Sequence, residues 1–143
     1  MNDAVRIAFA TSDRRRVDQH FGSAEGFVVY AVSAEEAVLT DVAEFGDLAQ
    51  DGNEDKLAAK LKMLEGCAAV YCQAVGASAI RQLLAIGVQP VKVESGAIVA
   101  GLIDELQQAM RSTPPPWLIK ARSAATSRDG GRFDAMEAEG WSE

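Results

Sequence analysis

Short apolar runs alternate with polar segments along most of the chain, and each run has the length of a single β-strand. Runs that are apolar on both faces are typical of strands that helices cover on both sides of a sheet. The pattern predicts strands at Val5–Thr11, Phe27–Val32, Val38–Phe45, Ala68–Val75 and Val88–Val93. The third alternates between apolar and polar residues, and the fifth contains Pro90, so both are predicted near an edge of the sheet.

Apolar residues that recur at the helical spacing predict helices between and after the later strands. The first starts at Asn53 and ends at Gly66, and the second runs from Ser78 to Gly87. The third opens at Ser95–Gly96. The residues predicted to face inward are Leu57, Leu61, Leu64, Ile80, Leu83, Leu84, Ile98, Leu102, Ile103, Leu106 and Met110. The lysines predicted to face water on the first helix are Lys56, Lys60 and Lys62.

The order of these elements predicts the topology of the sheet. The short link Ser33–Ala37 favours a hairpin, so the first three strands form a meander, and right-handed β-α-β units add the last two. The expected fold is a ribonuclease-H-like three-layer α/β fold, with a five-stranded mixed sheet of order 3-2-1-4-5 and helices on both faces. In such a sheet the loops after the first and fourth strands meet at the carboxyl ends of the strands, where ligands tend to bind.

The chain is predicted to divide near residue 112. Its 143 residues suit one ordinary domain, and Pro114–Pro116 ends the third helix. Residues 1–112 form the predicted α/β domain with the ligand-binding loops, and residues 113–143 form a C-terminal extension. Phe133, Met136 and Trp141 are unusual in a disordered tail. The extension either folds back on the domain or docks on a partner, and we expect it to be mobile in the free protein.

Charge and composition exclude several classes of function. A net charge of −7 argues against a general nucleic-acid binder, which would normally carry a basic face. Apolar runs are too short to cross a membrane, and the first residues do not resemble a secretory signal. The two cysteines, Cys67 and Cys72, form no disulfide framework, so a reducing, cytoplasmic location is expected.

The loop Ser12–Gly26 holds the only histidine, His20, and three consecutive arginines that begin at Arg14. Neutral imidazole is a common ligand of transition metals, and arginine can neutralise an anion. One histidine does not chelate a bare ion, so we expect it to contact one open position on a preassembled cluster. Further candidate residues for this site are Ser12, Gln19 and Gly22 in the same loop, with Gly76 and Ser78 at the start of the second helix.

Other interpretations of these residues stay open. A lone histidine is often structural, and Arg15 and Arg16 suit a solvated loop equally well. Asp13 and Asp18 are expected to cap turns, or to orient an arginine or the histidine, rather than to act as catalytic acids. The cysteines are expected to be buried, inert thiols. A nuclease is disfavoured because the first and fourth strands carry no acidic residue for a metal ion, and a Ser-His-Asp hydrolase is remote because no nucleophile elbow is present.

Four long segments carry a resemblance to a known family. They are VRIAFATSDRRRVDQHFGSAEGFVVY, EFGDLAQDGNEDKLAAKLKMLEGCAAVYC, GASAIRQLLAIGVQPVKV and GRFDAMEAEGW, and together they cover nearly the whole chain. They are similar to the dinitrogenase iron–molybdenum cofactor biosynthesis family, which includes NifX, NifY and NafY. The VDQHFGSA core is typical of the whole family, whereas NEDKLAAK, RQLLAIGVQPVKV and the tail resemble its NifX branch.

The resemblance implies a ribonuclease-H-like fold and a small, non-enzymatic carrier of iron–sulfur precursors of the cofactor, such as the NifB product. It implies NifB and the scaffold complex NifEN as partners, and it makes the histidine of the HFG motif, here His20, a cofactor ligand. Related sequences can carry a cysteine where this chain has Val75, so ligation would depend more heavily on His20. The alternative is a regulatory interaction module of the same assembly machinery, without obligatory cluster binding.

Overall fold

The computed structural model describes residues 4–44 and 54–121, and it confirms an α/β fold built on a five-stranded mixed sheet. In chain order the elements are β1 Val5–Ala10, β2 Arg16–Val17, β3 Gly26–Val32, β4 Ala37–Glu44, α1 Glu54–Leu64, β5 Cys67–Cys72, α2 Ala77–Ala85, β6 Gln89–Lys92, β7 Ala97–Ile98 and α3 Val99–Arg111. The order of strands in the sheet is β4-β3-β1-β5-β6. Strand β1 pairs antiparallel with β3 and parallel with β5, so it lies at the centre.

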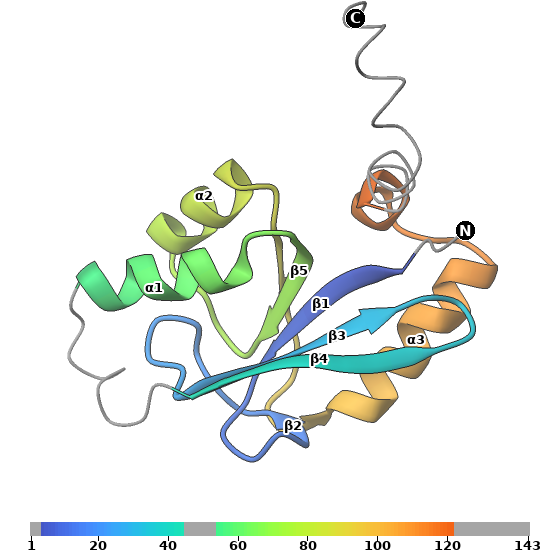
Figure 1. Ribbon diagram of the computed structural model, residues 1–143, viewed down its shortest axis with the longest axis horizontal. Helices are drawn as coiled ribbons and strands as arrows, with labels where there is room; N and C mark the ends of the chain where they lie inside the picture. Colours follow the sequence, from blue (N-terminus) through green and yellow to red (C-terminus); the bar gives the residue numbers. More distant parts are fainter. Residues whose placement is uncertain (1–3, 45–53, 122–143) are drawn as a thin grey trace, which may run out of the picture.

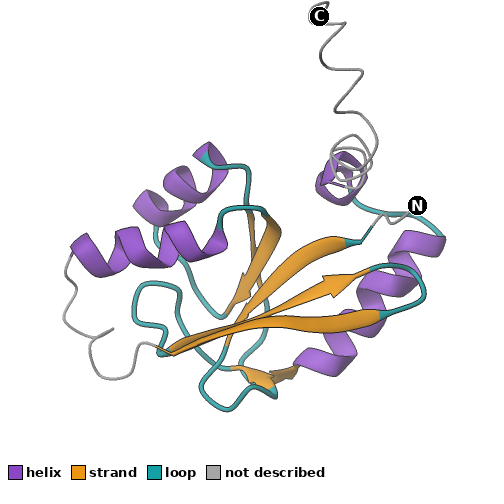
Figure 2. Ribbon diagram, viewed as in Figure 1, coloured by secondary structure: helices purple, strands orange, loops and turns teal. Residues whose placement is uncertain are grey.

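Helices cover both faces of the sheet (Figure 1). On one face α3 packs its buried residues, among them Leu102 and Leu106, against Ile7 and Phe9 of β1. On the other face Leu64 of α1 and Leu83 of α2 belong to a cluster with alternate β1 residues such as Ala8. Figure 2 shows the resulting arrangement of helices around the central strands. Because successive side chains of β1 point to opposite faces, this one strand contributes to both cores.

The loop after β1 contains a short strand that the sequence pattern did not predict. Strand β2 pairs antiparallel with β7, which directly precedes α3, in a separate two-stranded sheet. The N–H of Val99 also donates to the carbonyl oxygen of Arg15 at 2.8 Å. The third helix therefore begins at Val99, not at Ser95, because residues 97 and 98 are extended to pair with β2. Ile98, predicted to face inward, is 56% exposed.

Two other predicted side-chain orientations were wrong. Leu84 on α2 is 52% exposed, because Leu83 is the residue of this helix that fills the core. Lys60 on α1 is 1% exposed instead of facing water. Its long side chain reaches a carbonyl group of the loop after β1, so the polar end is satisfied inside the protein.

The residues that follow α3, up to residue 121, pack against the domain. Residues 116–121 form a helical turn, and Leu118 is fully buried in the same cluster as β1 and α3. Trp117 and Ala121 also pack against this cluster. The predictions for Phe133, Met136 and Trp141, and for mobility of the extension beyond residue 121, lie outside the described residues. No helix in the described part of the chain is long and apolar enough to cross a membrane.

Gly26 stands where the chain enters β3, and we expect alanine to be poorly tolerated there. A Cβ atom would lie 2.9 Å from the carbonyl oxygen of Ala43 and 3.2 Å from that of Thr11. Because both contacts are backbone atoms, Gly26→Ala is expected to lower the free energy of unfolding by about 1–3 kcal/mol. Gly22→Ala is the matched control, since nothing lies within 4 Å of its Cβ position. Urea denaturation of both variants measures the difference, and equal stability would contradict the close approach.

Candidate functional site

Two loops meet beside the carboxyl ends of β1 and β5. The N–H of Gln73 donates to the carbonyl oxygen of Gln19 at 2.9 Å, and the N–H of Phe21 donates to that of Ala74 at 2.8 Å. His20 forms an isolated parallel bridge with Ala74. We call the surface formed by residues 19–22 and 73–78 the loop junction. The predicted meeting of these two loops is confirmed.

His20 occupies the middle of the loop junction with its side chain exposed. The next residue, Phe21, is fully buried and packs against Phe27 with ring centroids 5.8 Å apart. Backbone hydrogen bonds hold the residues on both sides of His20. The imidazole is therefore presented to solvent from a fixed backbone, with a buried aromatic ring as the anchor.

The beginning of the loop is held by carboxylates that accept hydrogen bonds from its own backbone. Asp13 Oδ1 accepts from the N–H groups of Arg15 at 2.8 Å and Arg16 at 3.0 Å. These two hydrogen bonds hold the pKa of the Asp13 carboxyl below its usual range. Asp18 accepts from the N–H of Ser12 at 2.9 Å and from its hydroxyl at 2.6 Å. Of the two roles predicted for these aspartates, the structure shows the first, because both carboxylates accept hydrogen bonds from backbone N–H groups of the loop.

Arg14 points toward the β4 edge of the sheet. Its Nη2 lies 2.8 Å from Glu44 Oε2, and both side chains are largely exposed. The backbone of Arg14 has φ of 69°, in the left-handed region, and its N–H donates to Thr11 Oγ1 at 2.9 Å. An exposed ion pair of this kind contributes little to stability, so Arg14 remains available to an anion that competes for it.

Helix α2 starts inside the loop junction, and the N–H groups of its first turn have no partner within the helix. Gly76 is the N-cap residue, and no side chain caps the helix. The Ser78 hydroxyl is exposed and accepts a hydrogen bond from Gln82 Nε2 at 3.1 Å. Nothing lies within 4 Å of a Cβ position at either Gly22 or Gly76, so both glycines leave open space in front of the backbone. The start of a helix favours negative charge.

The structure thus places five of the predicted site residues in the loop junction and two outside it. The residues at the loop junction are Gln19, His20, Gly22, Gly76 and Ser78. Ser12 is joined to it through Asp18, and Arg14 is engaged with Glu44. Gln19 accepts from the N–H of Glu25 through Oε1 at 3.0 Å, which closes the loop on itself. Within residues 4–44 and 54–121, no three histidine, cysteine, aspartate or glutamate side chains gather to hold a metal ion.

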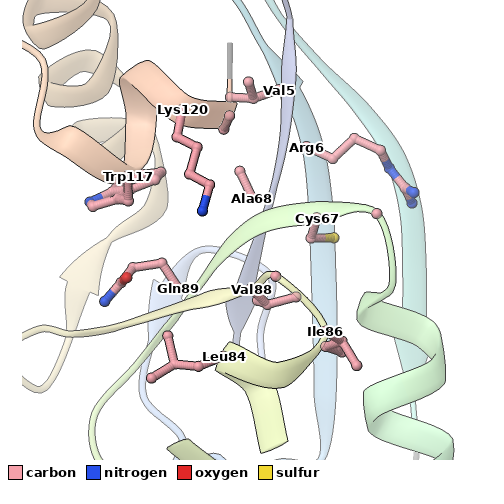
Figure 3. A pocket seen from close by; sticks show the side chains of 13 residues that line it. Val5, Arg6, Cys67, Ala68, Leu84, Ile86, Val88, Gln89, Trp117 and Lys120 are labelled. Carbon is pink, nitrogen blue, oxygen red and sulfur yellow. The ribbon is translucent and has the colours of Figure 1, made fainter. Parts of the chain in front are cut away.

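A cavity of about 390 Å³ lies at the opposite end of the sheet (Figure 3). Its lining includes Val5, Ala68 and Gln89, which stand near the amino ends of β1, β5 and β6. Trp117 and Lys120 close one side in Figure 3. The one metal-binding side-chain type in this lining is Cys67, and its thiol is buried. We therefore place the candidate site at the loop junction rather than at this cavity.

Both cysteines are expected to react slowly in the native protein, because burial raises the pKa of each thiol to about 11. The pKa of an ordinary thiol is 9.0, so at pH 8 the reactive thiolate of Cys67 or Cys72 is about a hundredfold rarer than in the unfolded chain. In the folded protein both thiols stay neutral below pH 9. As the pH rises from 9 through 11, the thiols of the unfolded chain lose their protons before those of the folded protein, so the free energy of unfolding falls. Mass spectrometry of iodoacetamide alkylation checks this, and equal rates in native and denatured protein would contradict it.

Comparisons with known proteins identify the family of the chain. A sequence profile described as "Dinitrogenase iron-molybdenum cofactor" matches residues 3–109, which include both loops of the junction. The protein NifX of Azotobacter vinelandii is 58% identical over 139 residues, which are 97% of this chain and 88% of that protein. The chain belongs to the NifX group of the dinitrogenase iron–molybdenum cofactor family. The NifX of Herbaspirillum seropedicae is 36% identical, with 87% of this chain and 86% of that protein covered.

A solved structure also shares the fold of this NifX-group protein. It comes from a dinitrogenase candidate of Methanocaldococcus jannaschii and superposes with a TM-score of 0.54. The alignment covers 77% of this chain and 93% of that chain, at 11% sequence identity. At this identity the likeness concerns the fold alone, so the chemistry of the NifX-group site must come from its own residues.

Proposed function

We propose that the chain is a non-enzymatic carrier, which binds an iron–sulfur precursor of the iron–molybdenum cofactor at the loop junction. Membership of the family gives the chain a role in the biosynthesis of this cofactor. The observation that carries the finer proposal is an exposed His20 between two backbone attachments, at the meeting point of two loops. A neutral imidazole in this position can contact one metal atom of a cluster that arrives already assembled.

The neighbouring groups suit an anionic cluster. The open space at Gly22 and Gly76 lets the cluster approach the backbone, and the start of α2 adds N–H donors with Ser78. Arg14 lies at the far side of the loop, and its guanidinium group can pair with the anionic cluster if its ion pair with Glu44 opens. Ser12 and Gln19 hold the loop rather than the cargo, since their side chains bond within it.

Sparse ligation suits a carrier, because its cargo must leave again. Val75 packs against the core on the α1 and α2 side and offers no metal ligand, so a single imidazole supplies the metal contact. We propose that NifB supplies the precursor and that NifEN receives it, in the cytoplasm. We also propose that the sheet and its helices form a ribonuclease-H-like arrangement.

Anaerobic gel filtration tests the proposal. The purified protein is mixed with the isolated NifB-type precursor, and iron is assayed in the protein peak for the wild type, His20→Ala and Arg15→Ala. We expect His20→Ala to retain at least about tenfold less iron, a loss of about 1.4 kcal/mol in binding, and Arg15→Ala to match the wild type. Equal iron in all three would remove His20 from binding. No iron in any would favour the regulatory interaction module.

A further inference from the structure

The side chain of Lys60 is buried at the inner side of the loop junction. It is 1% exposed, and its Nζ donates to the carbonyl oxygen of Gly22 at 2.7 Å. An ammonium group is among the most strongly hydrated side-chain groups, so burying it is costly unless its hydrogen bonds are satisfied. The burial of the Lys60 ammonium group therefore calls for a structural or functional explanation. Its acceptor, the Gly22 carbonyl oxygen, lies two residues after His20.

The carbonyl group that Lys60 binds completes the attachment of the loop. On the β5 side, residues 19 and 21 bond to the backbone of Gln73 and Ala74. On the α1 side, the Gly22 carbonyl is held by Lys60 from a helix that lies 38 residues further along the chain. Figure 1 shows α1 beside the loop that follows β2. His20 thus projects from a backbone that is held from two sides.

We propose that Lys60 is a positioning residue of the cluster site, which fixes the Gly22 carbonyl and so the backbone that presents His20. The effect of Lys60 on cluster binding rests on the proposed function, because the loop that Lys60 fixes is the proposed binding loop. A lysine has three N–H donors and a long side chain, so it can reach from a helix to a carbonyl group of the loop. Helix α1 and the binding loop then form one unit.

Lys60→Met tests the proposal, because methionine keeps an apolar side chain of similar length and removes the donor. Lys62→Met is the matched control, since Lys62 is exposed on the same helix and loses the same charge. Lys60→Arg keeps a donor and a charge, and it supplies a folded variant if Lys60→Met does not fold. Hydrogen exchange of the Phe21 and Gln73 amides is followed by NMR without any cargo.

We expect Lys60→Met to speed exchange of these two amides at least tenfold relative to Lys62→Met, while amides of β1 keep their rates. In the gel-filtration assay, we expect Lys60→Met to retain several-fold less iron and Lys60→Arg to recover part of the loss. Unchanged loop exchange, or full iron retention with a loosened loop, would overturn the proposal. If even the wild type retains no iron, the proposed function fails, and the exchange rates still decide whether Lys60 fixes the loop.

Discussion

Phe21→Ala is expected to lower the free energy of unfolding by about 3–5 kcal/mol, the usual cost of removing a buried phenylalanine. Phe21 is fully buried, and its ring packs against Phe27 under the binding loop. Its loss leaves a cavity, and it also removes the anchor next to His20. Urea denaturation measures the change in stability.

Phe21→Leu serves as the control for the same position. Leucine keeps an apolar side chain, so it is expected to cost clearly less than alanine and to preserve iron retention. A Phe21→Ala protein as stable as the wild type would show that Phe21 does not anchor the loop. A folded Phe21→Ala protein with full iron retention would show that binding does not depend on this anchor.

Leu118→Ala is the second substitution with a large expected effect, a loss of about 2–5 kcal/mol. Leu118 is fully buried among residues of β1 and α3, although it lies beyond the end of α3 and after three prolines. Thermal or urea denaturation checks this expectation. The result decides whether residues 116–121 contribute to the stability of the domain.

Ile119 offers a matched control for Leu118, because it is 52% exposed on the same helical turn. We expect Ile119→Ala to change stability by less than about 0.5 kcal/mol, as surface substitutions usually do. Equal effects of the two alanine substitutions would contradict the packing of this turn on the core.

The elements of the main sheet could be predicted from the sequence because their patterns are strong. Apart from Arg6, residues 5–10 and 67–72 are apolar on both faces, as expected of strands buried between helices. The helix after β5 ends at Ala85, and Gly87 follows two residues later with φ of 81°, which suits glycine. The meeting of the loops after β1 and β5 could be predicted from the topology, because the carboxyl ends of neighbouring parallel strands lie at the same edge of a sheet.

The features that the sequence did not predict depend on contacts between distant residues. The pairing of β2 with β7 joins two-residue segments about 80 residues apart, too short to show a periodic pattern. That pairing exposes Ile98 and moves the start of α3 to Val99. Lys60 has the helical position of a surface lysine, and its burial depends on contacts such as the hydrogen bond to the Gly22 carbonyl, 38 residues earlier in the chain.

Some residues of the candidate site could be predicted from the sequence, and others could not. His20, Gly22 and Gly76 stood out because histidine and glycine are informative in polar loops. The separation of Arg14 from them could not be foreseen, because it depends on the position of Glu44 at the end of β4. The sequence also could not show that the Ser12 hydroxyl donates to Asp18 within the loop.

The central claim is that His20 contacts a metal of the bound cluster, and the chain allows a direct test. Because His20 is its only histidine, labelling with ¹⁵N-histidine marks this one imidazole. Pulsed electron paramagnetic resonance of the protein with the cluster in a paramagnetic state then reports any nitrogen bound to it. We predict a ¹⁵N hyperfine coupling that is absent in His20→Ala. A cluster that is bound to the wild type without this coupling would contradict the claim.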